Sequence, residues 1–365
     1  RQLNFLPIVC DLRGLRHKSE GRLSPFFFLY WLLMGRTAGM TIIVLLLCFA
    51  LACGSTDSKP SLTDPDTLPL ESRVRARIAG LEARASLHAK HLPSGRQIAI
   101  QADEPMNSVS VIKIAIMVLA YRDAENGRLN LEERYLLRPQ DKRRGSGVLQ
   151  VFAPGLQPTY RDLITQMIIT SDNTATDIVI KKVGLERVND MLETLGYEQT
   201  RLQGTLADRY RRRWEVLDPS YSSLTDLEVF ERGFPSDPGA EERKFALNAD
   251  PAEWLGRTTA RETSRLLEQI HNGELSSPSS RDEMIDILKK QESFSRLPQR
   301  IRLQGAVVAH KTGDSPPTTA NDVGILYYPG GPTVVSVFTN ENRGDFVDLE
   351  ATIGLIAEDL ITEWR

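Results

Sequence analysis

The sequence predicts an α+β fold: an antiparallel β-sheet flanked by N- and C-terminal helices, with an all-helical subdomain inserted between its strands. Three observations lead to this prediction. Apolar residues alternate with a period of two near the start of the folded region, at 97–101, and again near its end, at 306–310, 322–328 and 333–339. Between these segments the apolar residues follow the helical period of 3.6. An amphipathic helix at 346–364 closes the chain.

The expected helices have recognisable ends. Gly184 ends one of them, and Thr259 forms a capping box with Glu262 that opens a helix running to Gly273. A helix at 71–85 precedes the first strand. Within the inserted subdomain we expect helices at 109–125, 160–169, 173–183, 186–195, 260–273 and 280–291.

Length, composition and charge narrow the class of protein. The 365 residues are enough for one large domain or two ordinary ones. Hydrophobic residues make up 41% and charged residues 25%, which excludes collagen, a coiled-coil rod and a largely disordered chain. The formal net charge is -3, so no basic surface is indicated and we expect no nucleic-acid partner. We also expect a monomer.

The cysteines and histidines exclude several kinds of site. Cys10, Cys48 and Cys53 are the three cysteines, and all lie in the first 53 residues. The rest of the chain therefore has no internal disulfide, no thiol nucleophile and no cysteine-based zinc site. The five histidines show no H-E-x-x-H spacing. We therefore expect no metal and no cofactor.

The first part of the chain predicts export. Residues 1–52 are interpreted as a spurious upstream segment followed by a signal peptide, with translation starting at Met34 or Met40. Small residues precede Cys53, as in a bacterial lipoprotein, so Cys53 is the expected lipidation site; a plain cleaved signal or a membrane anchor is the alternative. Residues 53–72 are expected to form a tether. The domain would then be periplasmic and held at the membrane by its lipid anchor only.

The folded region is expected at 73–365, with its α/β part at 73–104 and 302–365 and its helical part at 105–301. The helical part contains a long insertion at 203–257, which is polar, charged and rich in turn residues. We expect this insertion to be irregular. Long irregular loops are uncommon in compact domains, so it is either functional or a mobile surface segment.

The first chemical motif is Ser110-Val-Ile-Lys113 at the start of a predicted helix. Residues three apart on a helix are neighbours on one face. Apolar residues flank Lys113 on both sides, so its ammonium should be partly desolvated, which lowers a lysine pKa. A neutral amine can take the proton of a serine hydroxyl. On its own the pattern is weak, because most such serines cap a helix and most such lysines are solvated.

Two further motifs follow along the chain. Ser171-Asp172-Asn173 lies between an apolar run and a helix, where it could equally be an ordinary N-cap cluster. Lys311-Thr312-Gly313 lies at the end of a predicted strand, where a surface lysine in a turn is the ordinary alternative. Gly313 allows a ligand to approach the backbone, and Lys311 supplies a fixed positive charge.

Together, in this order, the three motifs resemble those of the class A serine β-lactamases. The resemblance extends over roughly 73–365. It includes Met106-Asn107-Ser108 before the first motif, the run 171–177, and His310 to Gly313 followed by Asn321-Asp322-Val323-Gly324. The fold that it implies is the β-lactamase/transpeptidase-like arrangement of sheet and helical subdomain predicted above.

The resemblance implies catalytic roles for three residues. Ser110 would attack the lactam carbonyl, Lys113 would activate Ser110, and Ser171 would pass a proton to the leaving nitrogen. Class A enzymes also carry a glutamate that directs water at the acyl-enzyme, and here the sequence departs from the family motif. Glu215 in Arg-Trp-Glu is the better candidate for this deacylation base and Glu253 the poorer one. A solvated loop acid is the alternative for Glu215.

The resemblance also implies substrate contacts. Asn173 would bind the substrate amide and steady Lys113, while Lys311 and Thr312 would hold the substrate carboxylate. The backbone N–H groups of Ser110 and Asp314 would form the oxyanion hole. Asp314 is a second departure, because relatives often carry serine or threonine after Lys-Thr-Gly. An aspartate there would repel an anionic substrate unless its side chain turns away.

Three functions compete on this evidence. The first is a serine β-lactamase that works through an acyl-Ser110 intermediate. The second is a penicillin-binding D,D-peptidase, which acylates in the same way but deacylates slowly or not at all; its substrate would resemble a peptidoglycan stem peptide. The third is a non-catalytic lipoprotein that binds cell-wall fragments.

Overall fold

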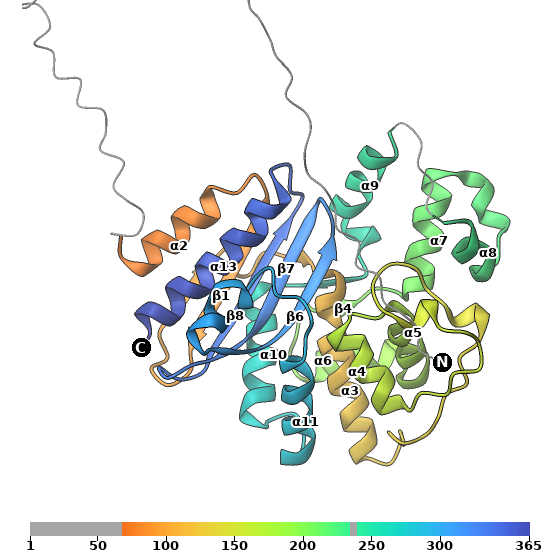
Figure 1. Cartoon of the computed structure of the whole chain (residues 1–365), viewed down its shortest axis with the longest axis horizontal. Helices are drawn as coiled ribbons and strands as arrows, with labels where there is room; N and C mark the ends of the chain where they lie inside the picture. The colour runs from red at the N-terminus through yellow and green to blue at the C-terminus, as the bar shows by residue number, and fades with distance from the viewer. Residues whose placement is uncertain (1–67, 234–238) are drawn as a thin grey trace, which may run out of the picture. The chain divides into compact units, whose positions relative to one another are not determined.

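A five-stranded antiparallel sheet forms the centre of the computed structural model, which describes residues 68–233 and 239–365 (Figure 1). The strand order is β2-β1-β8-β7-β6, so the first strands of the chain lie beside the last. The strands are β1 (Arg84–His91), β2 (Gln97–Ile100), β6 (Val307–Ser315), β7 (Thr319–Tyr327) and β8 (Thr333–Asn340). Strand β1 pairs with β8 along its whole length, from Arg84 opposite Asn340 to His91 opposite Thr333. The predicted pairing of early and late strands is confirmed.

The terminal helices α2 (Leu70–Ala79) and α13 (Phe346–Glu363) lie side by side against one face of the sheet (Figure 1). Strand β8 shows how the two faces differ. Val335 and Val337 belong to the core shared with α2 and α13, while Val334 and Phe338 belong to the core shared with the helical subdomain. Because successive side chains of a strand point to opposite faces, one strand contributes to both cores.

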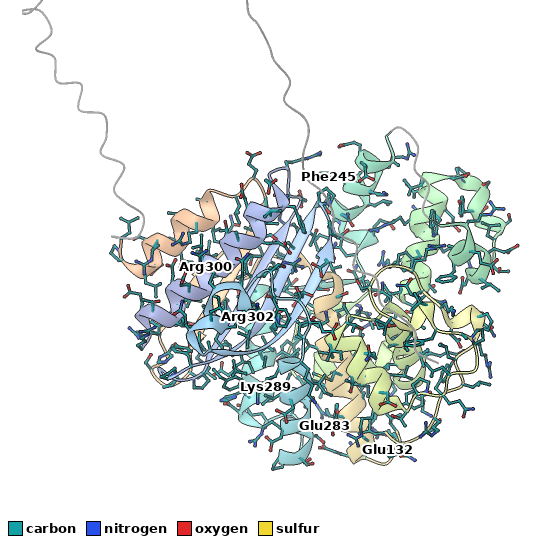
Figure 2. The ribbon with its side chains drawn as sticks, viewed as in Figure 1. Glu132, Phe245, Glu283, Lys289, Arg300 and Arg302 are labelled. Carbon is teal, nitrogen blue, oxygen red and sulfur yellow. The ribbon has the colours of Figure 1, made fainter. Side chains whose placement is uncertain are left out.

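The helical subdomain packs against the other face. Its helices are α3 (Lys113–Glu125), α4 (Tyr160–Ile169), α5 (Asn173–Val183), α6 (Leu185–Thr194), α10 (Ala260–Asn272) and α11 (Pro278–Lys289), close to the predicted ranges. A short helix α12 (Pro298–Ile301) leads back to the sheet. Within the subdomain Arg161 of α4 pairs with Glu132 and with Glu283 of α11. Both glutamates are labelled in Figure 2. The α+β architecture is confirmed.

A small second sheet supports the segment before Ser110. Its order is β3-β5-β4, with β3 (Met106–Asn107), β4 (Arg201–Leu202) and β5 (Gly256–Thr258). Side chains of the large sheet hold the same segment: Asn340 Oδ1 accepts from Asn107 N at 2.7 Å, and Asn321 Nδ2 donates to Asn107 O at 2.8 Å. Strands of two or three residues show no period, so the sequence did not predict them.

Two predicted boundaries were wrong. The helix predicted at 71–85 ends at Ala79, and the following residues form strand β1. Most residues of β1 are buried on both faces of the sheet, so they do not alternate in polarity. Strand β6 continues to Ser315, so Lys311-Thr312-Gly313 lies inside a strand and not in a turn.

The insertion is helical, which corrects the prediction of an irregular segment. It forms α7 (Leu206–Leu217), α8 (Asp226–Arg232) and α9 (Ala240–Ala249). Capping boxes of Thr205 with Asp208 and of Thr225 with Glu228 open α7 and α8. A small core joins the first two helices, in which Trp214 stacks on Tyr221 with ring centroids 4.9 Å apart.

The predicted leader and Cys53 lie outside the described residues, as does most of the tether. Within 68–233 and 239–365, none of the helices has both the length and the apolar character needed to cross a membrane.

A buried ion-pair cluster joins the two terminal helices and generates a stability prediction. Asp359 of α13 accepts from Arg77 at 2.6 Å and lies 3.1 Å from Arg73, and the Asp359 side chain is only 11% exposed. Replacing Asp359 with alanine leaves two arginines without this carboxylate, so Asp359→Ala should lower the free energy of unfolding by about 3 kcal/mol in urea titrations. Asp286→Ala is the matched control, because Asp286 is 61% exposed where it pairs with Lys289. Equal effects of the two substitutions would contradict the prediction.

Candidate active site

Ser110 lies on a tight turn, the 3-10 helix η3 (Val109–Ile112), directly before α3. Val109 has a φ of 45°, a left-handed conformation that is rare for a β-branched residue. Asn107 Oδ1 accepts from Val109 N at 3.0 Å and helps to hold this conformation. Strained backbone of this kind is found at functional sites. The turn places Ser110 in the wall of a cavity of about 750 Å³, which we call the Ser110 cavity.

Lys113 is fully buried at the first position of α3. Its Nζ donates to Ser171 O at 2.7 Å, to Ser171 Oγ at 3.2 Å and to Asn173 Oδ1 at 3.0 Å. These partners belong to the second motif and do not include Ser110. Burial, and secondly the charge of Lys311, hold the Lys113 pKa well below its usual value. This environment therefore makes the Lys113 ammonium give up a proton more readily than a solvated lysine does.

The hydroxyl of Ser171 joins all three motifs. Ser171 lies between α4 and α5 with a φ of 56°, and its Oγ accepts from Lys113 at 3.2 Å and from Lys311 at 3.0 Å. Burial lowers the pKa of Lys311 to about 8. Because both lysines act as donors to Oγ, the hydroxyl hydrogen of Ser171 remains available for a third partner.

Asn173, in the first turn of α5, forms hydrogen bonds through both its side-chain oxygen and its side-chain nitrogen. Its Oδ1 accepts from Lys113, and its Nδ2 donates to Arg144 O at 3.0 Å and to Tyr210 OH at 2.9 Å. The bond to Lys113 agrees with the predicted steadying role. A substrate amide would have to displace one of the two acceptors of Nδ2, because an amide nitrogen has only two hydrogens.

Strand β6 lies against the Ser110 turn at Gly313. A Cβ atom at this position would lie 2.7 Å from Ser108 O and 3.3 Å from Ser110 N, so only glycine allows the approach. This contact brings the strand backbone beside the backbone N–H of Ser110, where the oxyanion hole is predicted. Thr312 and Ser171 line a neighbouring hollow of about 330 Å³, which we call the Thr312 pocket.

The carboxylate of Asp314 is neutralised by Arg296. Arg296 pairs with Asp314 and with Glu350, the latter at 2.9 Å, and donates to Asn321 O at 2.8 Å. The Arg296 side chain is almost completely buried. The ion pair therefore weakens the repulsion that Asp314 would exert on an anionic substrate.

The two candidate deacylation bases occupy different places. Glu215 lies on α7 and is not among the residues that line the Ser110 cavity, whereas Glu253 lines it. Glu253 is held by Arg212 at 3.1 Å and by Arg209 at 3.8 Å.

The other carboxylates of the cavity are also paired. Glu241 pairs with Lys244, Glu242 with Arg343, and Asp314 with Arg296. Each carboxylate that lines the cavity within the described ranges thus has a cationic partner.

The sequence did not predict that the insertion forms part of the wall of the Ser110 cavity. Helices α7 and α9 bring Tyr210, Arg213 and Phe245 to the Ser110 cavity, and Phe245 is labelled on α9 in Figure 2. Asp177 of α5 fixes the start of α7, because its carboxylate accepts from Leu206 N at 2.7 Å and from Ala207 N at 2.9 Å. The capping box of Thr205 with Asp208 is a sequence signal for the start of α7, whereas no capping side chain opens α9.

The residues described contain no group of three or more histidine, cysteine, aspartate or glutamate side chains placed to hold a metal ion.

Comparison with known proteins agrees with this geometry. A family model described as the β-lactamase enzyme family matches residues 69–364. The β-lactamase of Streptomyces fradiae is 25% identical over 305 residues, which cover 79% of this chain and 85% of that protein. Beta-lactamase VEB-1 of Pseudomonas aeruginosa is 24% identical over 294 residues, which cover 77% and 84%.

Solved structures show the same fold. A β-lactamase from Sphaerobacter thermophilus superposes with a TM-score of 0.64 at 27% identity and covers 80% of this chain and 96% of that one. PBP-A superposes with a TM-score of 0.64 at 23% identity and covers 81% and 95%. Because the family model spans most of the chain and the fold agrees, the chain belongs to the class A serine β-lactamase family.

Proposed function

We propose that the protein is a serine β-lactamase that opens the lactam ring through an acyl-Ser110 intermediate. The observation that supports this most strongly is the meeting of two buried lysines at the hydroxyl of Ser171, which lines the Thr312 pocket beside the Ser110 cavity. A structural serine needs no such arrangement, because burying two cationic groups side by side costs free energy.

In the proposed reaction Ser110 Oγ bonds to the lactam carbonyl carbon, and the C–N bond of the ring then breaks. The proton of Ser110 passes to the neutral amine of Lys113, and Ser171 gives its proton to the leaving nitrogen and is reprotonated by Lys113. The N–H groups of Ser110 and Asp314 stabilise the oxyanion. Lys311, with Thr312, attracts the substrate carboxylate. Water then releases the product from Ser110.

The carboxylates of the cavity support a second candidate, a penicillin-binding D,D-peptidase with slow deacylation. Deacylation needs a base within reach of a water molecule. Among the described residues, each carboxylate of the Ser110 cavity is held by lysine or arginine. Both candidates share the acylation step and differ in the lifetime of the adduct.

Location is also a proposal, and it rests on the sequence. The apolar run and small residues before Cys53 support export, with lipidation of Cys53 and a periplasmic position at the membrane.

The first prediction concerns the nucleophile. Incubation with benzylpenicillin should add the mass of the intact antibiotic to the protein, and Ser110→Ala should abolish both this adduct and nitrocefin turnover. Intact-protein mass spectrometry over time measures the adduct. Ser146→Ala, which removes another hydroxyl from the wall of the same cavity, should still form the adduct. An adduct on Ser110→Ala would overturn the proposal, and the absence of both an adduct and nitrocefin turnover with the unmodified protein would favour the non-catalytic binding function.

The second prediction concerns pH. Acylation should accelerate as pH rises and the Lys113 amine loses its proton, since its lowered pKa places that change below the usual lysine range. Above about pH 8 acylation should slow again, because Lys311 loses the positive charge that attracts the substrate carboxylate. Arginine keeps its charge at these pH values, so Lys311→Arg should move the alkaline decline to higher pH.

Stopped-flow measurement of acylation by nitrocefin at a series of pH values follows both the rise and the alkaline decline of the rate. Buffer without enzyme is the control. An alkaline limb that is identical in Lys311→Arg would contradict the role of Lys311.

The third prediction concerns deacylation. Glu253 is the most enclosed carboxylate on the insertion side of the cavity, at 15% exposure against 75% for Glu241 and 69% for Glu242. We therefore expect Glu253→Gln to lengthen the life of the acyl adduct by about 100-fold and to leave its formation rate unchanged. Glu215→Gln should leave both rates unchanged. The reverse result would make Glu215 the base, and a stable adduct on the unmodified protein would favour the D,D-peptidase.

A further inference from the structure

Four cationic side chains line the Ser110 cavity within the described ranges, and three of them have a carboxylate partner. Lys244 lies 2.6 Å from Glu241, Arg343 lies 3.1 Å from Glu242, and Arg209 lies 3.8 Å from Glu253. The fourth is Arg213 of α7. No described carboxylate lies within ion-pair distance of Arg213.

Arg213 is held in place by a chain of hydrogen bonds. Its Nη2 donates to Asn248 Oδ1 at 2.9 Å, and Asn248 Nδ2 donates to Thr318 Oγ1 at 2.9 Å. Thr318 Oγ1 in turn donates to Ser315 O at 2.8 Å, at the end of β6. The chain of bonds runs from the insertion to the turn that follows Lys311-Thr312-Gly313.

This arrangement leaves most of the guanidinium unused. A guanidinium has five N–H donors, and in the described part of the chain Arg213 makes one side-chain hydrogen bond, to Asn248. The Arg213 side chain is partly buried, and this burial lowers its pKa while Tyr210 and Glu253 act in the opposite direction. Arginine nevertheless stays charged at neutral pH. A desolvated cation attracts an anion more strongly than a cation in water does.

The position of Arg213 relative to the two hollows indicates which part of a substrate it meets. Ser146 and Asp314 line both the Ser110 cavity and the Thr312 pocket, so the two hollows adjoin. Arg213 lines only the Ser110 cavity and Thr312 only the Thr312 pocket. A substrate with its ring carboxylate near Thr312 and its carbonyl at Ser110 therefore extends its acyl side chain toward Arg213.

We propose that Arg213, positioned by Asn248, is a second carboxylate subsite that binds an anionic group on the acyl side chain of the substrate. The inference rests on the proposed acylation of Ser110. It names a substrate class, compounds with two carboxylates, one on the ring side and one on the acyl side of the reacting carbonyl. The planar guanidinium suits such a group, because two parallel N–H donors match the two oxygens of a carboxylate.

The test compares two penicillins that differ in one group. Carbenicillin is benzylpenicillin with an added carboxylate on the acyl side chain. The second-order rate constant of acylation is measured for each in the unmodified protein and in Arg213→Gln. It is taken from intact-protein mass where the adduct accumulates, and from kcat/KM of hydrolysis where it does not. Arg213→Gln should slow acylation by carbenicillin by about tenfold, the effect of one hydrogen bond between charged groups, and should leave benzylpenicillin within about twofold. Arg213→Lys should restore part of the loss.

Two controls separate binding from folding. Arg212→Gln changes the neighbouring arginine, which is 56% exposed and does not line the cavity, and should leave the ratio of the two rates unchanged. The melting temperature of each variant shows whether loss of the hydrogen bond from Arg213 to Asn248 destabilises the fold. In the unmodified protein the rate for carbenicillin should fall more steeply with salt than the rate for benzylpenicillin, and this measurement needs no variant.

The outcomes are distinguishable. An unchanged ratio in Arg213→Gln overturns the subsite. Equal slowing of both penicillins in a variant that melts normally also overturns it, because Arg213 would then act on the carboxylate that both compounds share. Absence of both an adduct and hydrolysis with either penicillin on the unmodified protein removes the proposed function itself.

Discussion

The shared hydroxyl of Ser171 is the interaction on which the rest of the site depends. Lys113 and Lys311 are both fully buried, and both donate to Ser171 Oγ. Two ammonium groups at one oxygen in a desolvated space repel each other strongly, so each makes the other easier to deprotonate. Burial lowers the pKa of both lysines. In the proposed reaction Lys113 gives up its proton and acts as the base, while Lys311 keeps its charge.

The fold brings these groups together from distant parts of the chain. Lys113 opens a helix of the inserted subdomain, while Lys311 lies in strand β6 of the sheet. Strand β6 lies against the Ser110 turn at Gly313. Only glycine permits this close approach, because a Cβ atom at this position would collide with Ser108 O. Asn321 and Asn340, on β7 and β8, hold the segment before the turn by side-chain bonds to its backbone. The sheet therefore positions both sides of the site.

The sequence predicted the parts of this arrangement that repeat a local pattern. The amphipathic helix α4 was predicted to the residue, and the strand predicted at 333–339 is confirmed by β8. The motif order also led to Ser110, Lys113, Ser171 and Lys311, and the structure brings three of these side chains into contact. Strand β1 was missed because burial on both faces removes the alternation that marks a strand.

Other features of the site depend on contacts between segments far apart, which no local pattern records. The pairing of Asp314 with Arg296 and the two donors of Asn173 Nδ2 are of this kind. The insertion is the clearest case. Its high charge predicted an exposed irregular segment, yet the charges are largely paired within the wall of the cavity, as Glu253 is with Arg209 and Arg212.

Paired charges in the insertion have a further consequence for the chemistry of the cavity. A carboxylate held by arginine is a weaker base and a less mobile group than a free one, so the wall limits how fast water can attack the acyl-enzyme. The same pairing leaves Arg213 as the cation of the described cavity without a carboxylate, although Glu253 lies close enough to influence it. Glu253 and Arg213 are therefore neighbouring groups with separate effects, Glu253 on the lifetime of the adduct and Arg213 on the choice of acyl side chain. Substitution of one should leave the property governed by the other unchanged, whereas the Ser110–Lys113–Ser171 group, which the sheet and α3 hold, should govern the acylation of every substrate.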